Sequence, residues 1–282
     1  DDEAGAPGEQ AEEGLLHADN LSETRFAVMW TNHPWAIWYP TAGYDPEDAS
    51  MRTGRLGGYE PTHEGPFSTT EIWRSLSTII ARYFHHPQYW RIAGEPVLAI
   101  WAMTRLVDVF RLEGTRAFLD ELRDFARKLG HPGIHIHAVI QEPGMIPMMP
   151  HLAAMGVQSY SIYNAIAMAT DLRPDAEELL DYGVLAAEVV SRVWPDYDAA
   201  SALPFFPTIN PGTDNAPRWL EPPRPAQPSR ALWPSTPIVV DETPAAFEAL
   251  ASAALAFLNA RPSVPPVMNI NCWNEWTEGQ YM

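Results

Sequence analysis

The chain has 282 residues, 46% of them hydrophobic, which is enough for one large α/β domain or two small ones and excludes a disordered chain. Asp and Glu number 36 against 18 Lys and Arg, and the net charge of −18 excludes a basic face for nucleic acid and suits neutral sugars or cationic ligands. Cys272 is the only cysteine, so no internal disulfide can form, and no apolar run reaches the ~18 residues of a membrane span.

After an acidic segment at residues 1–20, strand-like and helix-like segments alternate along the sequence. Short apolar runs predict six strands, at 26–30, 96–101, 133–140, 157–162, 203–209 and 266–273. Helical spacing and capping residues predict four helices, at 69–84, 115–130, 174–194 and 243–261. Such alternation predicts a parallel sheet in a single domain over residues 21–282.

Two folds fit this alternation, a (β/α)₈ barrel and an open, doubly wound sheet. No G-x-G-x-x-G follows any strand, which weakens the dinucleotide-binding form of the doubly wound sheet. The segments 40–68 and 210–242 are rich in Pro, Gly and Asp, and we expect them to be long loops that carry function.

The stretch NINCWNEWTEGQYM, residues 269–282, holds the strongest chemical signal. Strand alternation places the odd positions from 267 to 275 toward a barrel interior and positions 268, 270 and 272 against the helices. Glu275 then emerges at the carboxyl end of the strand, and Gly279 lets the chain turn so that Glu278 faces the same pocket. Two carboxyls in an aromatic cleft suffice for glycoside chemistry, but solvated loop glutamates beside core indoles fit the spacing equally well.

Four segments resemble, in the same order, motifs of the WbsX-type family, which is related to glycoside hydrolase family 99. They are MWTNHPWAIW (29–38), YFHHPQYWRIAGEPVLAIW (83–101), PGTDNAPRW (211–219) and WNEWTEG (273–279). The resemblance covers the chain from about residue 20 and implies a (β/α)₈ barrel. It also implies that the six strands are strands three to eight, because residues 1–20 offer no counterpart to the family's first two. Six strands cannot close this barrel, so we expect the missing part to exist elsewhere.

By this resemblance, Glu275 and Glu278 match the two catalytic acids of family 99, which are thought to act with retention. Glu275 would be the base acting on the sugar's own 2-hydroxyl, and Glu278 the general acid on the leaving oxygen. The residues do not choose between this scheme and a direct nucleophile. The sequence departs from the family at His33, Thr213 and Trp101, where Glu, Trp and Tyr are usual, and the first two departures bear on substrate specificity.

Other substrate-binding candidates lie at strand ends, in the long loops or beside the acid pair. They are Trp30, Asn32, Trp35, Gln141, Glu142, Tyr160, Asp214, Asn215, Arg218, Trp273, Asn274 and Trp276. Core packing is the alternative for Trp35, and a loop clamp with an aspartate is the alternative for Arg218. His135 and His137 share a strand face and fit hydrogen-bonded core groups better than metal ligands, so we expect no metal and no cofactor.

The leading interpretation is a glycoside hydrolase that cleaves internal bonds of a glycan or polysaccharide, with the periplasm or the cell exterior as its location. A glycosyltransferase or polysaccharide-assembly protein is the alternative, because WbsX-type proteins are often labelled so. The third hypothesis is a non-catalytic glycan-binding barrel, in which the two glutamates lie too far apart to share a substrate. Nothing in the sequence indicates the oligomeric state, the sugar or the linkage.

Overall fold

The computed structural model describes ten segments of the chain. These are residues 14–31, 35–40, 59–63, 68–101, 103–140, 143–171, 179–215, 237–272, 274–275 and 278–281. Within them, no helix is both long enough and apolar enough to cross a membrane.

A parallel sheet whose strands follow their order in the sequence forms the centre of the molecule. Its successive neighbours are β1 (Val28–Thr31), β5 (Glu95–Trp101), β6 (His135–Ile140), β7 (Ser159–Ile162) and β9 (Phe205–Phe206). Strand β10 (Thr208–Ile209) continues β9 after Pro207 and pairs in parallel with β12 (Asn269–Ile270), so the segment 205–209 joins β7 to β12. All six predicted strands are therefore confirmed, although the last ends at Ile270 instead of residue 273.

The helices begin where local capping chemistry predicts. Helix α2 (Thr69–Tyr83) starts with a capping box, in which Ser68 Oγ accepts from the backbone N–H of Glu71 and the Glu71 carboxylate accepts from that of Ser68. Helix α7 (Pro244–Asn259) starts at the predicted cap, where Thr243 Oγ1 accepts from Ala246 N at 3.1 Å. Helix α3 (Met103–Lys128) includes the predicted helix at 115–130 but begins earlier, and it is interrupted at Arg111.

The remaining elements are short. Helical segments are α4 (Ala165–Asp171), α5 (Tyr182–Glu188), the π-helix Val189–Val193, α6 (Trp194–Ala199) and the 3₁₀ segments Leu15–His17, Leu21–Glu23 and Pro143–His151. Strand β4 (Arg91–Ile92) pairs with β5, and β8 (Leu179–Asp181) pairs in parallel with β11 (Ile238–Val240). Two antiparallel pairs complete the fold, β2 (Trp35–Pro40) with β3 (Tyr59–His63) and β13 (Asn274–Glu275) with β14 (Gln280–Tyr281).

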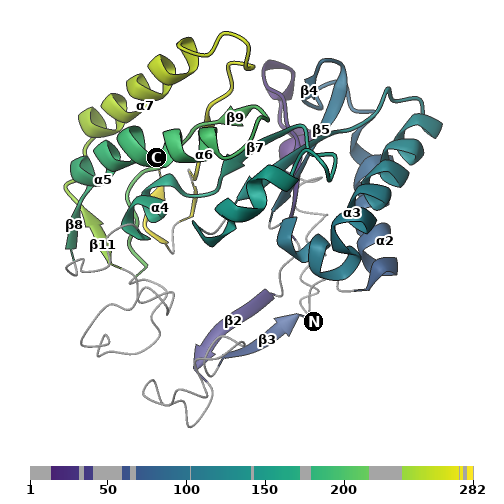
Figure 1. Ribbon diagram of the computed structural model, residues 1–282, viewed down its shortest axis with the longest axis horizontal. Coiled ribbons are helices and arrows are strands. Elements are labelled where there is room, and N and C mark those ends of the chain that lie inside the picture. The colour runs from purple at the N-terminus through teal and green to yellow at the C-terminus, as the bar shows by residue number, and fades with distance from the viewer. Residues whose placement is uncertain are drawn as a thin grey trace.

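The main hydrophobic core lies between the helices and one face of the sheet. Leu98, Ile136 and Phe205 of the sheet join the apolar stripes of α2, α3, α4, α5 and α7 in a single buried cluster. Figure 1 shows α2 and α3 at one end of the molecule and α5 and α7 at the other, with β5, β7 and β9 of the parallel sheet between them. The described helices thus cover one face, whereas the helices of a doubly wound sheet cover both.

Three sequence predictions about elements are corrected. The helix predicted at 174–194 does not begin at Pro174, because Leu179–Asp181 forms β8 and Asp181 caps α5 through a hydrogen bond from Val184 N at 2.8 Å. The predicted loop 40–68 contains β3, and the predicted loop 210–242 contains β11. These strands are short and pair with distant segments, which local patterns do not reveal.

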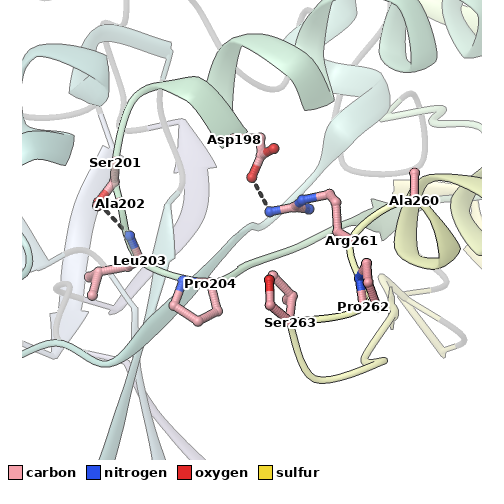
Figure 2. A pocket seen from close by; sticks show the side chains of 10 residues that line it. Asp198, Ser201, Ala202, Leu203, Pro204, Ala260, Arg261, Pro262 and Ser263 are labelled. Carbon is pink, nitrogen blue, oxygen red and sulfur yellow. Dashed lines mark hydrogen bonds and ion pairs between the residues drawn. The ribbon is translucent and has the colours of Figure 1, made fainter.

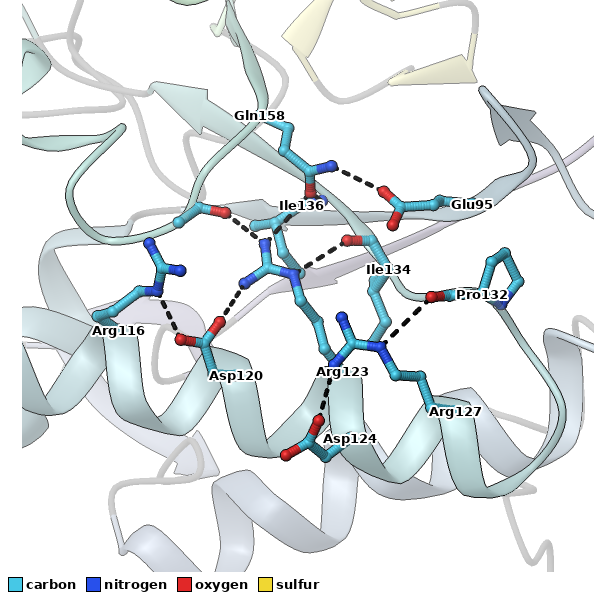
Figure 3. A network of polar contacts seen from close by, with 11 residues as sticks. Glu95, Arg116, Asp120, Arg123, Asp124, Arg127, Pro132, Ile134, Ile136 and Gln158 are labelled. Atoms are coloured by element: carbon cyan, nitrogen blue, oxygen red, sulfur yellow. Dashed lines mark hydrogen bonds and ion pairs between the residues drawn. The ribbon is translucent and has the colours of Figure 1, made fainter.

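Arg123 of α3 ties this helix to the amino ends of two strands (Figure 3). Its guanidinium donates to Ile134 O before β6 at 3.3 Å, and to Gly156 O and Gln158 Oε1 before β7. Asp120 pairs with the same guanidinium at 3.0 Å. This network lies at the end of the sheet opposite the one where barrel active sites are found.

Candidate active site

The face of the sheet turned away from the helices, which we call the inner face, has a mixed polar and aromatic surface. Strand register aligns two rows of side chains across it: Met29, Ala99, His137 and Ser159 in one, and Thr31, Trp101, Val139, Ser161 and Phe206 in the other. Neither row contains a charged residue. Any charge at the carboxyl end of the sheet must therefore come from the segments that follow the strands.

Two histidines and two serines form a hydrogen-bonded chain on the inner face. Ser159 Oγ lies 2.7 Å from His135 Nε2 and 2.8 Å from His137 Nδ1, and Ser161 Oγ lies 2.9 Å from His137 Nε2. Burial lowers the pKa of His135 to about 4 and that of His137 to about 3, so both rings are neutral near pH 7. This confirms that they are hydrogen-bonded core groups. Within the described ranges, no three His, Cys, Asp or Glu side chains are grouped to hold a metal ion.

An aromatic corner stands where β5, β6 and β7 end. Trp101 and Tyr163 meet edge to face, with ring centroids 6.3 Å apart, and Trp101 packs on Val139 in a cluster separate from the main core. In the sequence, Tyr163 was only a weaker candidate at the end of its strand, and Trp101 was noted only as a departure from the family pattern. Trp101 is the last residue of its strand and lies two positions after Ala99, so it shares a face with Ala99. This spacing could have identified it.

The chain forms a hairpin after the last strand, and this hairpin carries the two glutamates. Glu275 is in β13, opposite Gln280 in β14, and Glu278 is in the turn between the two strands. Both glutamates are half-buried. The predicted alternation does not extend this far, because β12 ends at Ile270 and the chain changes direction before Glu275.

The thiol of Cys272 lies among these acids. Its sulfur is 3.2 Å from Gln280 Oε1 and 3.9 Å from Glu275 Oε2. Burial, and then the charges of Glu275 and Glu278, raise the pKa of this thiol to about 12. Strand alternation had put Cys272 and Glu275 on opposite faces, and this contact corrects that expectation. Glu275 thus contacts this half-buried sulfur, and Glu278 lies in the turn of the same hairpin.

The loop after β10 packs against the hairpin. Asp214 N donates to Glu278 O at 2.8 Å, and Gln280 Nε2 donates to Thr213 Oγ1 at 3.0 Å. Gly279 has a φ of +65° and passes so close to Asp214 that a Cβ there would come within 3.0 Å of the Asp214 backbone nitrogen. The structure thus brings predicted site residues from two loops, Asp214 and Glu278, into direct contact.

Asn210 holds three strand ends together, and sequence reasoning missed it. Its side chain is fully buried, its Oδ1 accepts from Ala165 N at 2.7 Å, and its Nδ2 donates to Asn271 O. Tyr182 Oη donates to Asn210 O at 2.7 Å. These bonds join the segments that follow β7, β10 and β12, and so fix the base from which the glutamate hairpin extends.

Two predicted substrate contacts lie on the other side of the sheet. Trp30 is 6% exposed and belongs to the core cluster beneath the helices. Tyr160 is fully buried in the same cluster, and its hydroxyl donates to Tyr197 O at 2.5 Å. This packing argues against a sugar contact for either residue, and we leave both out of the site proposed below.

The structure describes only some of the remaining predicted site residues. Asn215 is buried directly after Asp214. The inner-face amides of Asn269 and Asn271 bury their Nδ2 atoms with no acceptor among the described residues. Only the backbone is described for Trp35 and Asn274. The residues that lie outside the described segments are Asn32, His33, Gln141, Glu142, Arg218, Trp273 and Trp276.

A hollow of about 450 Å³ lies at the opposite, amino end of the strands (Figure 2). Arg261 and Asp198 form an ion pair in its wall, and Arg261 also donates to Phe205 O at 3.3 Å. The guanidinium stacks on Phe257, 4.7 Å from the ring centre. Asp198 thus already neutralises the charge of Arg261. The hollow lies between the turn after α6 and the turn after α7.

The in-order parallel sheet, with helices on one face and two acids after its last strand, defines an α/β protein with a candidate site at the carboxyl end. Residues 9–282 match the model of the family described as glycosyltransferase WbsX, and the chain belongs to this family.

Similar proteins are found among curated sequences and solved structures. The protein WxcX of Xanthomonas campestris pv. campestris, printed as uncharacterized, is 24% identical over 268 residues, or 93% of this chain and 33% of that protein. The chain therefore spans about a third of the length of the curated relatives it matches. A glycoside hydrolase-like protein aligns with a TM-score of 0.46 at 12% identity, covering 75% of this chain and 53% of that one. A family 99 endo-α-mannosidase from Bacteroides thetaiotaomicron, solved with Bis-Tris propane, gives 0.44 at 13% identity, with 75% and 54% covered.

Proposed function

We propose that the chain is the catalytic part of a glycoside hydrolase that cleaves internal bonds of a glycan, with Glu275 and Glu278 as its acid pair. The observation that carries this proposal is that Glu275 contacts the Cys272 thiol after the last sheet strand, while Glu278 lies in the turn of the same hairpin and is held through its backbone by Asp214. Family membership supports a carbohydrate as the substrate. We further propose that two more strands complete a (β/α)₈ barrel around the inner face, and that the protein acts outside the cytoplasm.

Each element of the site has a role in this chemistry. Glu278 is the general acid that protonates the leaving oxygen, and Glu275 is the base that draws a proton from the sugar's 2-hydroxyl. Tyr163, packed edge to face on the buried Trp101, offers aromatic surface for a sugar ring at the same end of the sheet. The histidine and serine side chains beneath are neutral, so among the described residues they add no charge next to the two glutamates.

The test is a glycan panel with product analysis on the wild-type protein and on Glu278→Gln and Glu275→Gln. We expect each change to lower turnover by about 10²–10⁴-fold, because one proton transfer is lost, while glycan binding is kept. The matched control is Glu248→Gln on the exposed side of α7, which removes a carboxylate far from the site. Wild-type turnover in Glu278→Gln would overturn the assignment.

Transfer from a nucleotide sugar is the second candidate, because the matched family is described as a glycosyltransferase. The sequence contains one Asp-x-Asp triplet, a common metal–nucleotide motif in such enzymes, at Asp196–Tyr197–Asp198. It lies in α6, where Asp198 is paired with Arg261 and Tyr197 is buried, at the amino end of the strands. Calorimetry with uridine and guanosine diphosphate sugars separates the two functions, since a hydrolase has no site for the nucleotide. A glycan-binding barrel without activity, the third candidate, would bind panel glycans and release no product.

A further inference from the structure

Gln280 links the hairpin that carries both glutamates to the segments on either side of it. Its side chain is 1% exposed. The carboxamide oxygen accepts from the thiol of Cys272, just after the last sheet strand, and the carboxamide nitrogen donates to Thr213 Oγ1 in the loop after β10. One buried amide thus connects three pieces of chain: the hairpin, the residues after β12 and the loop after β10.

Backbone geometry reinforces this link. Asp214, the neighbour of Thr213, donates to Glu278 O, and Gly279 lies against the Asp214 backbone. Glu275 is opposite Gln280 in the antiparallel pair of β13 and β14. A shift of the Gln280 side chain would therefore move both glutamates relative to the strand ends.

We propose that Gln280 is the positioning residue of the acid pair, and that its buried hydrogen bonds to Thr213 and Cys272 hold the glutamate hairpin over the carboxyl end of the sheet. This inference rests on the proposed function, since it assigns Gln280 to the same two carboxylates. An amide suits the place because it accepts from a thiol and donates to a hydroxyl while adding no third charge. A glutamate there would put another carboxylate beside two that already share one environment.

Cys272 provides an assay that needs no substrate. It is the only cysteine of the chain, and thiolate is the form that reacts with iodoacetamide. The rate of alkylation against pH therefore reports how closely the hairpin acids and the surrounding burial act on this sulfur. Loosening the hairpin exposes the thiol and moves its pKa from about 12 toward the ordinary value.

The test compares four variants. Thr213→Val removes the acceptor of Gln280 Nε2 with little change of shape, and Gln280→Met removes the amide at similar length. Thr213→Ser keeps the hydroxyl. Ile136→Val, in the core under β6, is the remote control for a general loss of stability. We expect Thr213→Val and Gln280→Met to raise the alkylation rate at pH 8 by about tenfold or more, up to about 10³-fold, while Thr213→Ser and Ile136→Val react like the wild type.

A second measurement separates positioning from simple packing. In the wild type, Glu275→Gln should accelerate alkylation, because one of the charges that oppose the thiolate is removed. In the Thr213→Val background the same change should have little further effect, since the hairpin has already moved away. Additive effects of the two changes, or equal rates in Thr213→Val and Ile136→Val, would overturn the inference. Failure of the proposed function would show differently, as an absence of glycan products from a wild-type protein whose alkylation pattern is as expected.

Discussion

Gly279 is the residue at which the backbone of the glutamate hairpin passes closest to Asp214. Its φ of +65° lies in the left-handed region, and a Cβ would come 2.9 Å from the Cβ of Asp214 and 3.0 Å from its backbone nitrogen. The close approach is what lets Asp214 N reach Glu278 O at 2.8 Å. Position 279 thus requires glycine for two reasons: its φ is positive, and a Cβ would be too close to Asp214.

A Gly279→Ala change should therefore cost more than conformational strain. Gly94 is the matched control, because its φ is +86° but a Cβ there meets nothing within 4 Å. Both alanine variants should lose about 1–2 kcal/mol of stability from the left-handed conformation. Only Gly279→Ala should also accelerate alkylation of Cys272 and lower turnover of a glycan substrate. If the two variants differ in neither measurement, the contact with Asp214 has no part in the site.

The sequence indicated which residues lie near one another where they share a short motif, but it did not indicate which face of the sheet a strand residue occupies. Glu275 and Glu278 share such a motif, and the structure places both in one hairpin. Trp30 and Tyr160 were placed at strand ends correctly, but register shows them facing the helices. Alternation gives two faces and does not say which one the helices cover, because that depends on the path of the whole chain.

At the scale of elements, α3 and the amino ends of β6 and β7 form one unit through Arg123 (Figure 3). Gln158 extends the unit, since its amide nitrogen donates to Glu95 of β5 at 2.7 Å and its oxygen accepts from Ile136 N at 3.0 Å. The planar guanidinium donates at once to two backbone carbonyls, the Gln158 amide oxygen and the Asp120 carboxylate, which a lysine cannot do.

We expect Arg123→Lys to lower the free energy of unfolding by about 1–3 kcal/mol, because buried carbonyls lose their donors. Arg116→Lys is the matched control: Arg116 pairs with the same Asp120 at 2.6 Å, but it is half exposed, so its loss should cost less than about 1 kcal/mol. Urea unfolding of both variants at pH 7 gives the comparison. Equal midpoints would show that Arg123 contributes no more than a surface ion pair.

Among the elements, those defined by their own residues were predictable. The caps at Ser68 and Thr243 and the apolar runs of β5, β6 and β7 fixed helices and strands from a few neighbouring positions. Strand β8 was not, because three residues inside a helical pattern become a strand only through pairing with β11, far along the chain. The end of β12 was missed because the hairpin after it is set by contacts with the loop at 211–215.

At the scale of the whole molecule, the two side-chain rows across the inner face contain no charged residue, and this limits the pH range in which the protein is stable. His135 and His137 are buried there, hydrogen-bonded to Ser159 and Ser161, and His137 stacks on Phe206 with ring centroids 5.3 Å apart. Burial lowers both pKa values. At His135 the charge of Glu95 partly offsets this shift, and the charge of Arg123 adds to it. His135 in turn lowers the pKa of His137 further. A protonated ring would place an unpaired cation in this layer.

The sign of the resulting pH dependence follows from these shifts. Each histidine titrates near 6.5 in the unfolded chain and at about 3 or 4 in the folded one, so below pH 6.5 the unfolded chain binds more protons. The contribution of the two histidines to the free energy of unfolding should be level above about pH 7.5 and should fall from pH 6.5 toward pH 4, by about 1.4 kcal/mol per pH unit for each histidine.

Urea unfolding between pH 7.5 and 4.5 tests this dependence. His137→Asn should be less stable than the wild type at pH 7 but should show a slope smaller by about 1.4 kcal/mol per pH unit, because one titrating group is gone. The exposed His17→Asn is the control and should keep the wild-type slope. Carboxylates contribute equally to all three proteins, so they cancel in the comparison. Equal slopes for His137→Asn and the wild type would mean that His137 carries a proton in the folded protein. The conclusion that the inner face beneath the acid pair is neutral would then be wrong.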